Sequence, residues 1–192
     1  MRSRRITLLV EIALIAALSF VLGMFKIWEM PQGGSVSLEM LPIVVFALLE
    51  GVGPAVVAGL IAGMLGAVLH PEIVGWLQFV LDYPLAYGAV GLAGLFAPAW
   101  RRAAADGAWA RGIFTAILPA VLVACVARYA CHVASGYFFF GSYAPAGQPV
   151  LIYSMIYNSF VFVAGLLVFA AAAVLVPSLT RARELTQRGA TA

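Results

Sequence analysis

Long apolar segments, separated by short polar stretches, are the feature that most limits how this chain can fold. Hydrophobic residues make up 64% of the chain and charged residues only 10%, whereas a soluble domain carries about 25% charged residues. Most of the surface must therefore face lipid. Helices satisfy every backbone amide within one segment in hydrocarbon, and the sequence lacks the period-two alternation of membrane strands. The sequence predicts an all-α membrane protein, a bundle of six transmembrane helices.

We expect one transmembrane domain, residues 1–192, with six spans and a polar lid loop after the first. The predicted spans are 6–25, 38–49, 55–69, 73–98, 112–140 and 150–176, and the loop is 26–37. The second and third spans are shorter than the roughly 20 residues that cross a bilayer, so two arms of one re-entrant hairpin are an alternative for them. Glu50–Pro54 and His70–Glu72 are predicted turns, and the spacing of Gly59 and Gly63 allows close helix packing.

Basic residues mark one side of this arrangement. Nine of the eleven Lys and Arg residues fall in the N-terminus, the 101–111 loop and the C-terminal tail, which six spans place on the same side. Cytoplasmic segments carry such an excess, so both termini are predicted to be cytoplasmic. Orientation explains these clusters better than nucleic-acid binding does. The predicted location is the bacterial plasma membrane, as a multi-pass protein.

Six polar residues in the predicted spans need an explanation, since an ionisable side chain there costs about 2.5–3.5 kcal/mol on insertion scales. They are Glu11, Glu39, Asp82, Arg128, His132 and Asn158. Glu11 is explained by pairing with nearby arginines, and Glu39 by the favourable field of a helix N-terminus. The other four are predicted to lie at similar depths in the outer half of the bundle, with Asp82 roughly 14 Å from the surface.

The deeper polar residues have aromatic and small neighbours at helical spacing. One stripe on the fifth span holds Arg128, His132, Gly136 and Phe140. Tyr83 adjoins Asp82 on the fourth span, and Tyr153 shares a broad face with Asn158 on the sixth. A carboxylate, an imidazole, an amide and aromatic rings together suit a flat cationic heterocycle, because the anion supplies the counter-charge and the rings supply cation–π contacts.

Two other interpretations of these residues were considered. The first is an internal Asp82–Arg128 ion pair, with the aromatic rings at the membrane interface. The second is an intramembrane serine hydrolase using His132 and Ser135, but a serine three residues from its base on one helix is poor geometry. The sequence shows neither a metal-binding cluster nor a phosphate-binding loop. No enzymatic activity, metal or cofactor is therefore expected.

Four stretches carry a resemblance to a known family. They are Gly33–Pro42 (GGSVSLEMLP), Leu81–Ala86 (LDYPLA), Arg128–Gly136 (RYxxHxxxG) and Tyr153–Asn158 (YSxxYN). Taken in this order, across nearly the whole chain, they resemble the thiamine-specific substrate-binding subunits (S components) of energy-coupling factor (ECF) transporters.

The resemblance implies a six-helix fold that binds one thiamine near its outer face, under a lid formed by the loop after the first span. The substrate-binding residues that it carries over are Asp82, Tyr83, His132, Gly136, Tyr153 and Asn158. Two positions depart from the family. Phe140 stands where we align a stacking tryptophan, and Asp82 is one methylene shorter than the glutamate of some relatives. Trp28 is the candidate for the tryptophan of the lid.

The resemblance also implies partners. Family members dock onto a transmembrane coupling subunit through an Ala-x-x-x-Ala face, which Ala13 and Ala17 match, and two ATPase subunits supply the energy. Packing of these alanines inside the bundle is the alternative. For the function, the alternatives are a subunit specific for another vitamin or a thiamine precursor, and a stand-alone channel or facilitator.

Overall fold

The computed structural model describes residues 2–31, 33–69 and 73–189, most of which are helical. The predicted turn at His70–Glu72 lies outside these residues. In chain order the elements are α1 (Arg2–Met24), β1 (Trp28–Glu29), β2 (Ser35–Val36), α2 (Leu41–Glu50), α3 (Val52–Leu69), α4 (Trp76–Val80), η1 (Leu81–Leu85), α5 (Ala86–Val90), η2 (Gly91–Phe96), α6 (Ala97–Ala105), α7 (Trp109–Gly112), η3 (Ile113–Ile117), α8 (Leu118–Phe139), η4 (Gly141–Tyr143), α9 (Val150–Tyr157) and α10 (Phe160–Gly189).

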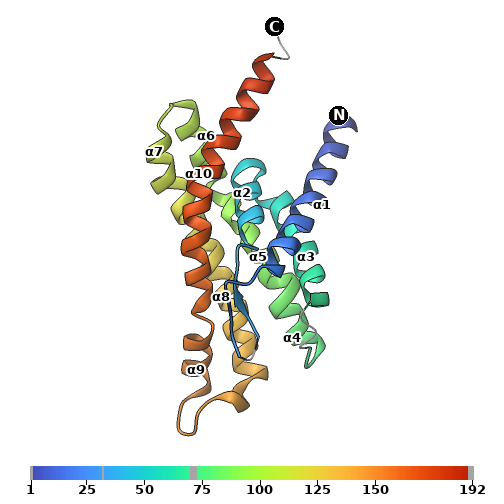
Figure 1. The fold of residues 1–192 in the computed structure, drawn as a ribbon, viewed down its shortest axis with the longest axis vertical. Coiled ribbons are helices and arrows are strands. Elements are labelled where there is room, and N and C mark those ends of the chain that lie inside the picture. Colours follow the sequence, from blue (N-terminus) through green and yellow to red (C-terminus); the bar gives the residue numbers. More distant parts are fainter. Residues whose placement is uncertain (1, 32, 70–72, 190–192) are drawn as a thin grey trace.

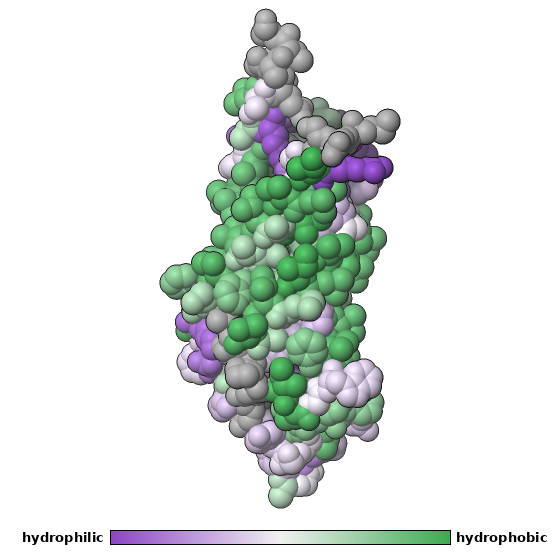
Figure 2. Space-filling model, turned by 90° about the vertical axis from the view of Figure 1, so that its right-hand side faces the viewer, coloured by the Kyte–Doolittle hydropathy of each residue, from purple (hydrophilic) through white to green (hydrophobic). Residues whose placement is uncertain are grey.

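Four helical stretches are long and apolar enough to cross a membrane: Arg4–Met24, Trp76–Ala105, Trp109–Phe139 and Val150–Thr186. Two shorter apolar helices, Leu41–Glu50 and Val52–Val68, complete six helical stretches in the predicted positions. The face in Figure 2 is largely hydrophobic through its middle, and polar residues gather toward its ends. This distribution is that of a multi-pass membrane protein.

Helix α2 lies at the centre of the bundle (Figure 1). Every residue from Leu41 to Leu48 is buried, and α2 contacts α1, α3, α8 and α10. Its surroundings are therefore protein rather than lipid. Because neighbouring helices cover it, α2 does not need the 20 apolar residues of a lipid-exposed span.

Close backbone contacts fix α3 against the helices that carry Asp82. A side chain at Gly59 would collide with the backbone of Tyr87, and one at Gly63 with the backbone of Tyr83. The predicted close packing through Gly59 and Gly63 is confirmed, and its partner is the η1–α5 segment. Residues lacking a Cβ are what allow two helix backbones to approach this closely.

The helix carrying Asp82 is interrupted where the site forms. Residues Leu81–Leu85 adopt a π-helical turn that contains Pro84. Proline has no backbone N–H, so the regular hydrogen-bond ladder cannot continue through it. Such π turns within α-helices often occur at functional sites, and this one turns Asp82 and Tyr83 toward the interior.

Several element boundaries differ from the expectation. Helix α3 begins at Val52, because proline is tolerated in a first turn. Helix α6 continues to Ala105, so Arg101 and Arg102 are helical and the connection is shorter than 101–111. The last helical stretch is divided at Asn158 and Ser159 and then continues through Pro177 to Gly189.

The predicted lid loop 26–37 contains a small hairpin. Strands β1 and β2 pair antiparallel, with Trp28 opposite Val36 and Glu29 opposite Ser35. Gly33 and Gly34 have positive φ values of 86° and 87°, which glycine adopts without strain. The hairpin lies toward the end of the bundle opposite the two chain termini, which share one end in Figure 1.

Candidate substrate-binding site

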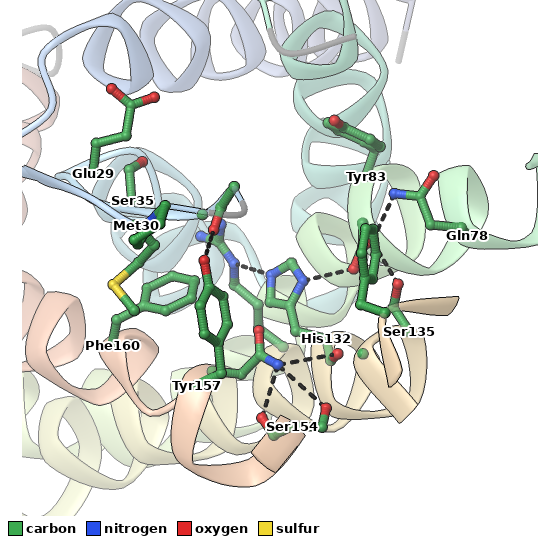
Figure 3. Close-up of a pocket in the computed structure, with 18 of the residues that line it drawn as sticks. Glu29, Met30, Ser35, Gln78, Tyr83, His132, Ser135, Ser154, Tyr157 and Phe160 are labelled. Carbon is green, nitrogen blue, oxygen red and sulfur yellow. Dashed lines mark hydrogen bonds and ion pairs between the residues drawn. The ribbon is translucent and has the colours of Figure 1, made fainter. Parts of the chain in front are cut away.

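A cavity of about 460 Å³ lies between the β1–β2 hairpin and the helices around it. Seven of the eight predicted substrate-binding residues line it: Asp82, Tyr83, His132, Gly136, Phe140, Tyr153 and Asn158. They come from η1, α8 and α9, with Phe140 and Asn158 at the ends of α8 and α9. Figure 3 shows the side chains of Tyr83 and His132 at the cavity, together with neighbours such as Gln78 and Ser135. The volume falls within the range of small-molecule sites.

Asp82 is the acceptor at the centre of the polar wall. Its carboxylate accepts hydrogen bonds from Gln78 Nε2 at 2.7 Å and Ser135 Oγ at 2.5 Å. His132 Nδ1 lies 2.9 Å from the other carboxylate oxygen. The side chain keeps 17% exposure, so this anion is both held in place and open to the cavity.

Arg128 pairs with Glu39, not with Asp82. The Arg128 Nη2–Glu39 Oε1 distance is 2.5 Å, and the two side chains are only 7% and 10% exposed. The guanidinium also lies 4.5 Å from the centre of the Tyr87 ring. The alternative of an Asp82–Arg128 ion pair is therefore wrong. Glu39 lies just before α2 and is the buried counter-ion of Arg128. The sequence had indicated only that the field of a helix N-terminus would favour its charge.

Asn158 ties α9 to α8. Its Nδ2 donates to the Ser154 carbonyl at 2.9 Å and approaches the His132 carbonyl at 3.4 Å. Ser154 Oγ donates to the Val133 carbonyl at 2.9 Å. Gly136 faces this contact, and a Cβ there would collide with the Ser154 side chain. Gly136 thus permits the close approach of α9 that places Tyr153 and Asn158 at the cavity.

Aromatic rings form much of the remaining wall. Tyr83 lies against Phe79 with ring centres 5.8 Å apart, and Tyr153 against Tyr157 at 5.7 Å. Phe140 stacks on Tyr143 outside the cavity, with an angle of 28° between the rings. These contacts restrict the rings and present flat apolar surfaces to a bound molecule.

The hairpin covers one side of the cavity through Met30, Gly33, Gly34 and Ser35. Tyr157 Oη donates to the Gly33 carbonyl at 3.0 Å, which joins α9 to the hairpin. Trp28 does not line the cavity, and it is 65% exposed. The predicted site residue Trp28 therefore lies outside the cavity in this arrangement, whereas Glu29 and Met30 of the same hairpin segment line it.

Gln78 and Phe160 also line the cavity and were not predicted from the sequence. Gln78 lies one helical turn before Asp82 and is 2% exposed. Ser135 was weighed only as a nucleophile, and its hydroxyl is committed to Asp82. A search for polar residues one turn from each intramembrane charge would have found Gln78, because side chains four residues apart are neighbours on a helix.

Ala13 and Ala17 lie on the outer surface of α1, whereas the adjacent Ala16 is buried with 1% exposure. Packing of Ala13 and Ala17 inside the bundle is therefore excluded. Glu11, in the same helix, lies 3.8 Å from Arg183 of α10 and so finds its partner far away in the sequence. The expected pairing with Arg4 or Arg5 is replaced by this contact.

Comparison with known proteins bears on what the cavity holds. Residues 9–185 match the family described as thiamine transporter protein. This chain belongs to that family. The chain is 38% identical over 168 residues to the thiamine transporter ThiT of Bacillus subtilis, covering 82% of this chain and 83% of that protein. It is 29% identical over 159 residues to ThiT of Lacticaseibacillus paracasei, covering 81% and 79% of the two chains.

The fold is also that of a solved relative. The structure of ThiT from Listeria monocytogenes superposes with a TM-score of 0.79 and 28% sequence identity, covering 90% of this chain and 96% of that one. The chain is thus a membrane protein of a transporter family. Within the described residues, no group of three or more His, Cys, Asp or Glu side chains is arranged to hold a metal ion.

Proposed function

We propose that this chain is the substrate-binding subunit of an ECF-type vitamin importer and binds thiamine in the cavity beneath the hairpin. The observation that carries the proposal is the charge of the cavity wall. Among the residues that the structure describes, its carboxylates are Glu29, Glu39 and Asp82, and its permanent cations are Lys26 and Arg128. Three negative and two positive charges leave one negative charge when His132 is neutral. The thiazolium ring of thiamine carries one positive charge and would balance it.

The pairing of the other charges places the excess at Asp82. Lys26 pairs with Glu29 at 2.5 Å and Arg128 with Glu39 at 2.5 Å. Asp82 accepts from the neutral donors Gln78 and Ser135, and His132 is its third partner among the described residues. A ligand cation near Asp82 would gain both this attraction and contacts with the faces of the surrounding rings. Thiamine is the only small molecule that the proposal requires.

The direction of binding follows from the distribution of basic residues. Arg101, Arg102, Arg111, Arg181 and Arg183 belong to α6, α7 and the last turns of α10, which lie toward the end that carries both termini (Figure 1). An excess of arginine indicates the cytoplasmic side. The hairpin and the cavity lie toward the other end, so the proposal has thiamine captured from outside by a bundle whose termini are cytoplasmic.

The energy for transport would come from partners. The sequence shows no phosphate-binding loop, and the exposed Ala13 and Ala17 give α1 a flat surface on which a coupling subunit can dock, with two ATPase subunits bound to that subunit. Replacing both alanines by tryptophan is expected to leave thiamine binding intact and to prevent co-purification of the coupling subunit. Loss of binding would show instead that this surface supports the cavity.

Calorimetric titration of the purified protein with thiamine, pyridoxine and riboflavin tests the substrate. The expected result is tight binding of thiamine and weak or no binding of the other two vitamins. Tight binding of another vitamin without thiamine binding would overturn the assignment. Thiamine uptake in cells that lack the ATPase partners would indicate a stand-alone facilitator instead.

A further inference from the structure

Four side chains from three segments form one continuous hydrogen-bonded line. Glu39 pairs with Arg128 Nη2, Arg128 Nε donates to His132 Nε2 at 3.1 Å, and His132 Nδ1 lies 2.9 Å from Asp82 Oδ1. The line begins at the buried Glu39 and ends at Asp82, whose carboxylate faces the cavity.

The donors in this line determine the state of His132. A guanidinium N–H can only donate, so His132 Nε2 must accept and cannot carry a proton. The ring proton therefore sits on Nδ1, where it is donated to Asp82. A second proton on Nε2 would point at the Arg128 N–H and would add a positive charge beside a guanidinium. His132 is thus neutral, in the Nδ1–H tautomer.

We propose that Arg128 is a positioning residue that acts through His132 and makes the site selective for a singly charged cation. The inference rests on the proposed function. Arg128 itself is neutralised by Glu39 and covered by Tyr87, with its side chain 7% exposed. By holding His132 neutral, it keeps the imidazole from adding a positive charge beside Asp82. An imidazolium at His132 would cancel that charge and remove the preference for a cationic ligand.

The two ends of the line have separate tasks. Glu39 keeps the guanidinium in place, because a buried arginine without a partner would be strongly unfavourable. Arg128 directs its Nε–H at the imidazole and so fixes both the tautomer and the orientation of the ring, as the hydrogen-bond partner of one ring nitrogen generally does for the other. Asp82 accepts a hydrogen bond from His132 Nδ1–H at one oxygen and from Gln78 and Ser135 at the other.

Nitrogen-15 NMR of histidine-labelled protein in micelles tests the tautomer directly. The chain has two histidines, His70 and His132, so in a His70→Gln variant both ring nitrogen signals come from His132. Without thiamine at neutral pH, we expect a protonated Nδ1 and an unprotonated Nε2. A proton on Nε2, or an imidazolium, would overturn the proposal. This measurement needs no ligand, so failure to bind thiamine would overturn the proposed function and leave this result standing.

A charge-balanced double variant tests the role of Arg128. Arg128→Met with Glu39→Gln removes one charge of each sign and the donor to His132 Nε2, and so keeps the net charge of the cavity. We expect His132 Nε2 to gain a proton, which gives an imidazolium, because Asp82 still accepts from Nδ1–H and no guanidinium N–H faces Nε2 any longer. We also expect thiamine affinity to fall about tenfold or more, the scale seen when the hydrogen-bond partner of a metal-ligating histidine is removed. The affinity for a neutral thiamine analogue should fall less.

The exposed Arg111–Asp106 pair provides a matched control. Its N–O distance is 2.6 Å, and its side chains are 59% and 61% exposed. Arg111→Met with Asp106→Asn removes the same kinds of charge far from the cavity and should change neither the tautomer nor the affinity. An Arg128→Met, Glu39→Gln protein that is folded, keeps Nε2 of His132 unprotonated and binds both ligands as the parent does would overturn the proposal.

Discussion

Two ion pairs with the same N–O distance stand in contrasting regions of this protein. Arg128–Glu39 and Arg183–Glu50 are both 2.5 Å long, and each joins segments distant in the sequence. The first lies beside the cavity with side chains 7% and 10% exposed. The second lies toward the end that carries the termini, with side chains 43% and 22% exposed. Because the N–O distances are equal, a difference in how much the two pairs stabilise the protein would be due to burial.

Burial decides what each pair contributes. An exposed pair gains little, because water screens it and two long side chains lose freedom. A buried pair has lost the hydration of both charges, so removing one partner leaves an uncompensated charge. The Arg128–Glu39 pair therefore specifies an arrangement, whereas the Arg183 contacts with Glu50 and Glu11 add weakly to the packing of α10 against α1 and the α2–α3 turn.

Removing Arg128 alone should have the largest effect on stability. Arg128→Met is expected to lower the free energy of unfolding by about 3–5 kcal/mol, because Glu39 would remain buried without its counter-ion. Thermal unfolding in detergent micelles measures this. Adding Glu39→Gln should recover most of the loss, and a double variant as unstable as the single variant would contradict this account.

Removing the charge of Asp82 tests the cavity side of the comparison. Asp82→Asn keeps the shape but removes the negative charge, and a hydrogen bond to a charged group contributes about 1.5–3 kcal/mol. Thiamine affinity should therefore fall by about ten- to 150-fold by calorimetry. A neutral analogue should lose much less, and equal losses for both ligands would show that Asp82 does not act as the counter-charge.

A glycine at each end of the molecule extends the comparison to packing. Gly136→Ala places a Cβ against the Ser154 side chain, and overpacking of this kind costs about 1–3 kcal/mol. Both stability and thiamine affinity should fall, because α9 must move away from α8. Gly53, in the first turn of α3, has no atom within 4 Å of such a Cβ. Gly53→Ala is the control and should be neutral or slightly stabilising.

The smallest effect is expected at Arg183. Arg183→Ala removes the contacts with Glu50 and Glu11 and should cost about 0.2–1 kcal/mol, with a smaller cost at high salt. Unfolding of parent and variant at low and high ionic strength measures the difference. If Arg183→Ala lowered the free energy of unfolding as much as Arg128→Met, the N–O distance of an ion pair would matter more for stability than its burial.

Much of the fold could be predicted from the apolar pattern. The six helical stretches lie close to the predicted ranges, since long apolar segments have few alternatives to helices in lipid. The boundaries moved most at Val52, Ala105 and Gly189, where polar or proline-containing turns remained helical. Hydrophobicity does not mark such ends, because a helix can continue into water beyond the membrane.

Candidate site residues could be identified from the sequence where a polar residue occurs within an otherwise apolar segment. Asp82, His132 and Asn158 were visible for that reason, and each lines the cavity. The orientation of Trp28 could not be predicted in this way, because the sequence of a loop has no periodicity that indicates which side chains point inward. Phe160 could not be identified in this way, since an aromatic residue in an apolar helix does not differ from its surroundings.

By itself, the sequence determined that this chain lies in a membrane, how many apolar helices it forms and which ionisable residues they must accommodate. Those properties depend on the free energy of transferring each side chain from water to lipid, which is local. The tertiary structure alone decided that Arg128 pairs with Glu39, 89 residues away, and that Asp82 remains for the cavity. Which of several carboxylates meets a buried cation depends on how the helices pack, and the spacing of residues along the chain does not contain that information.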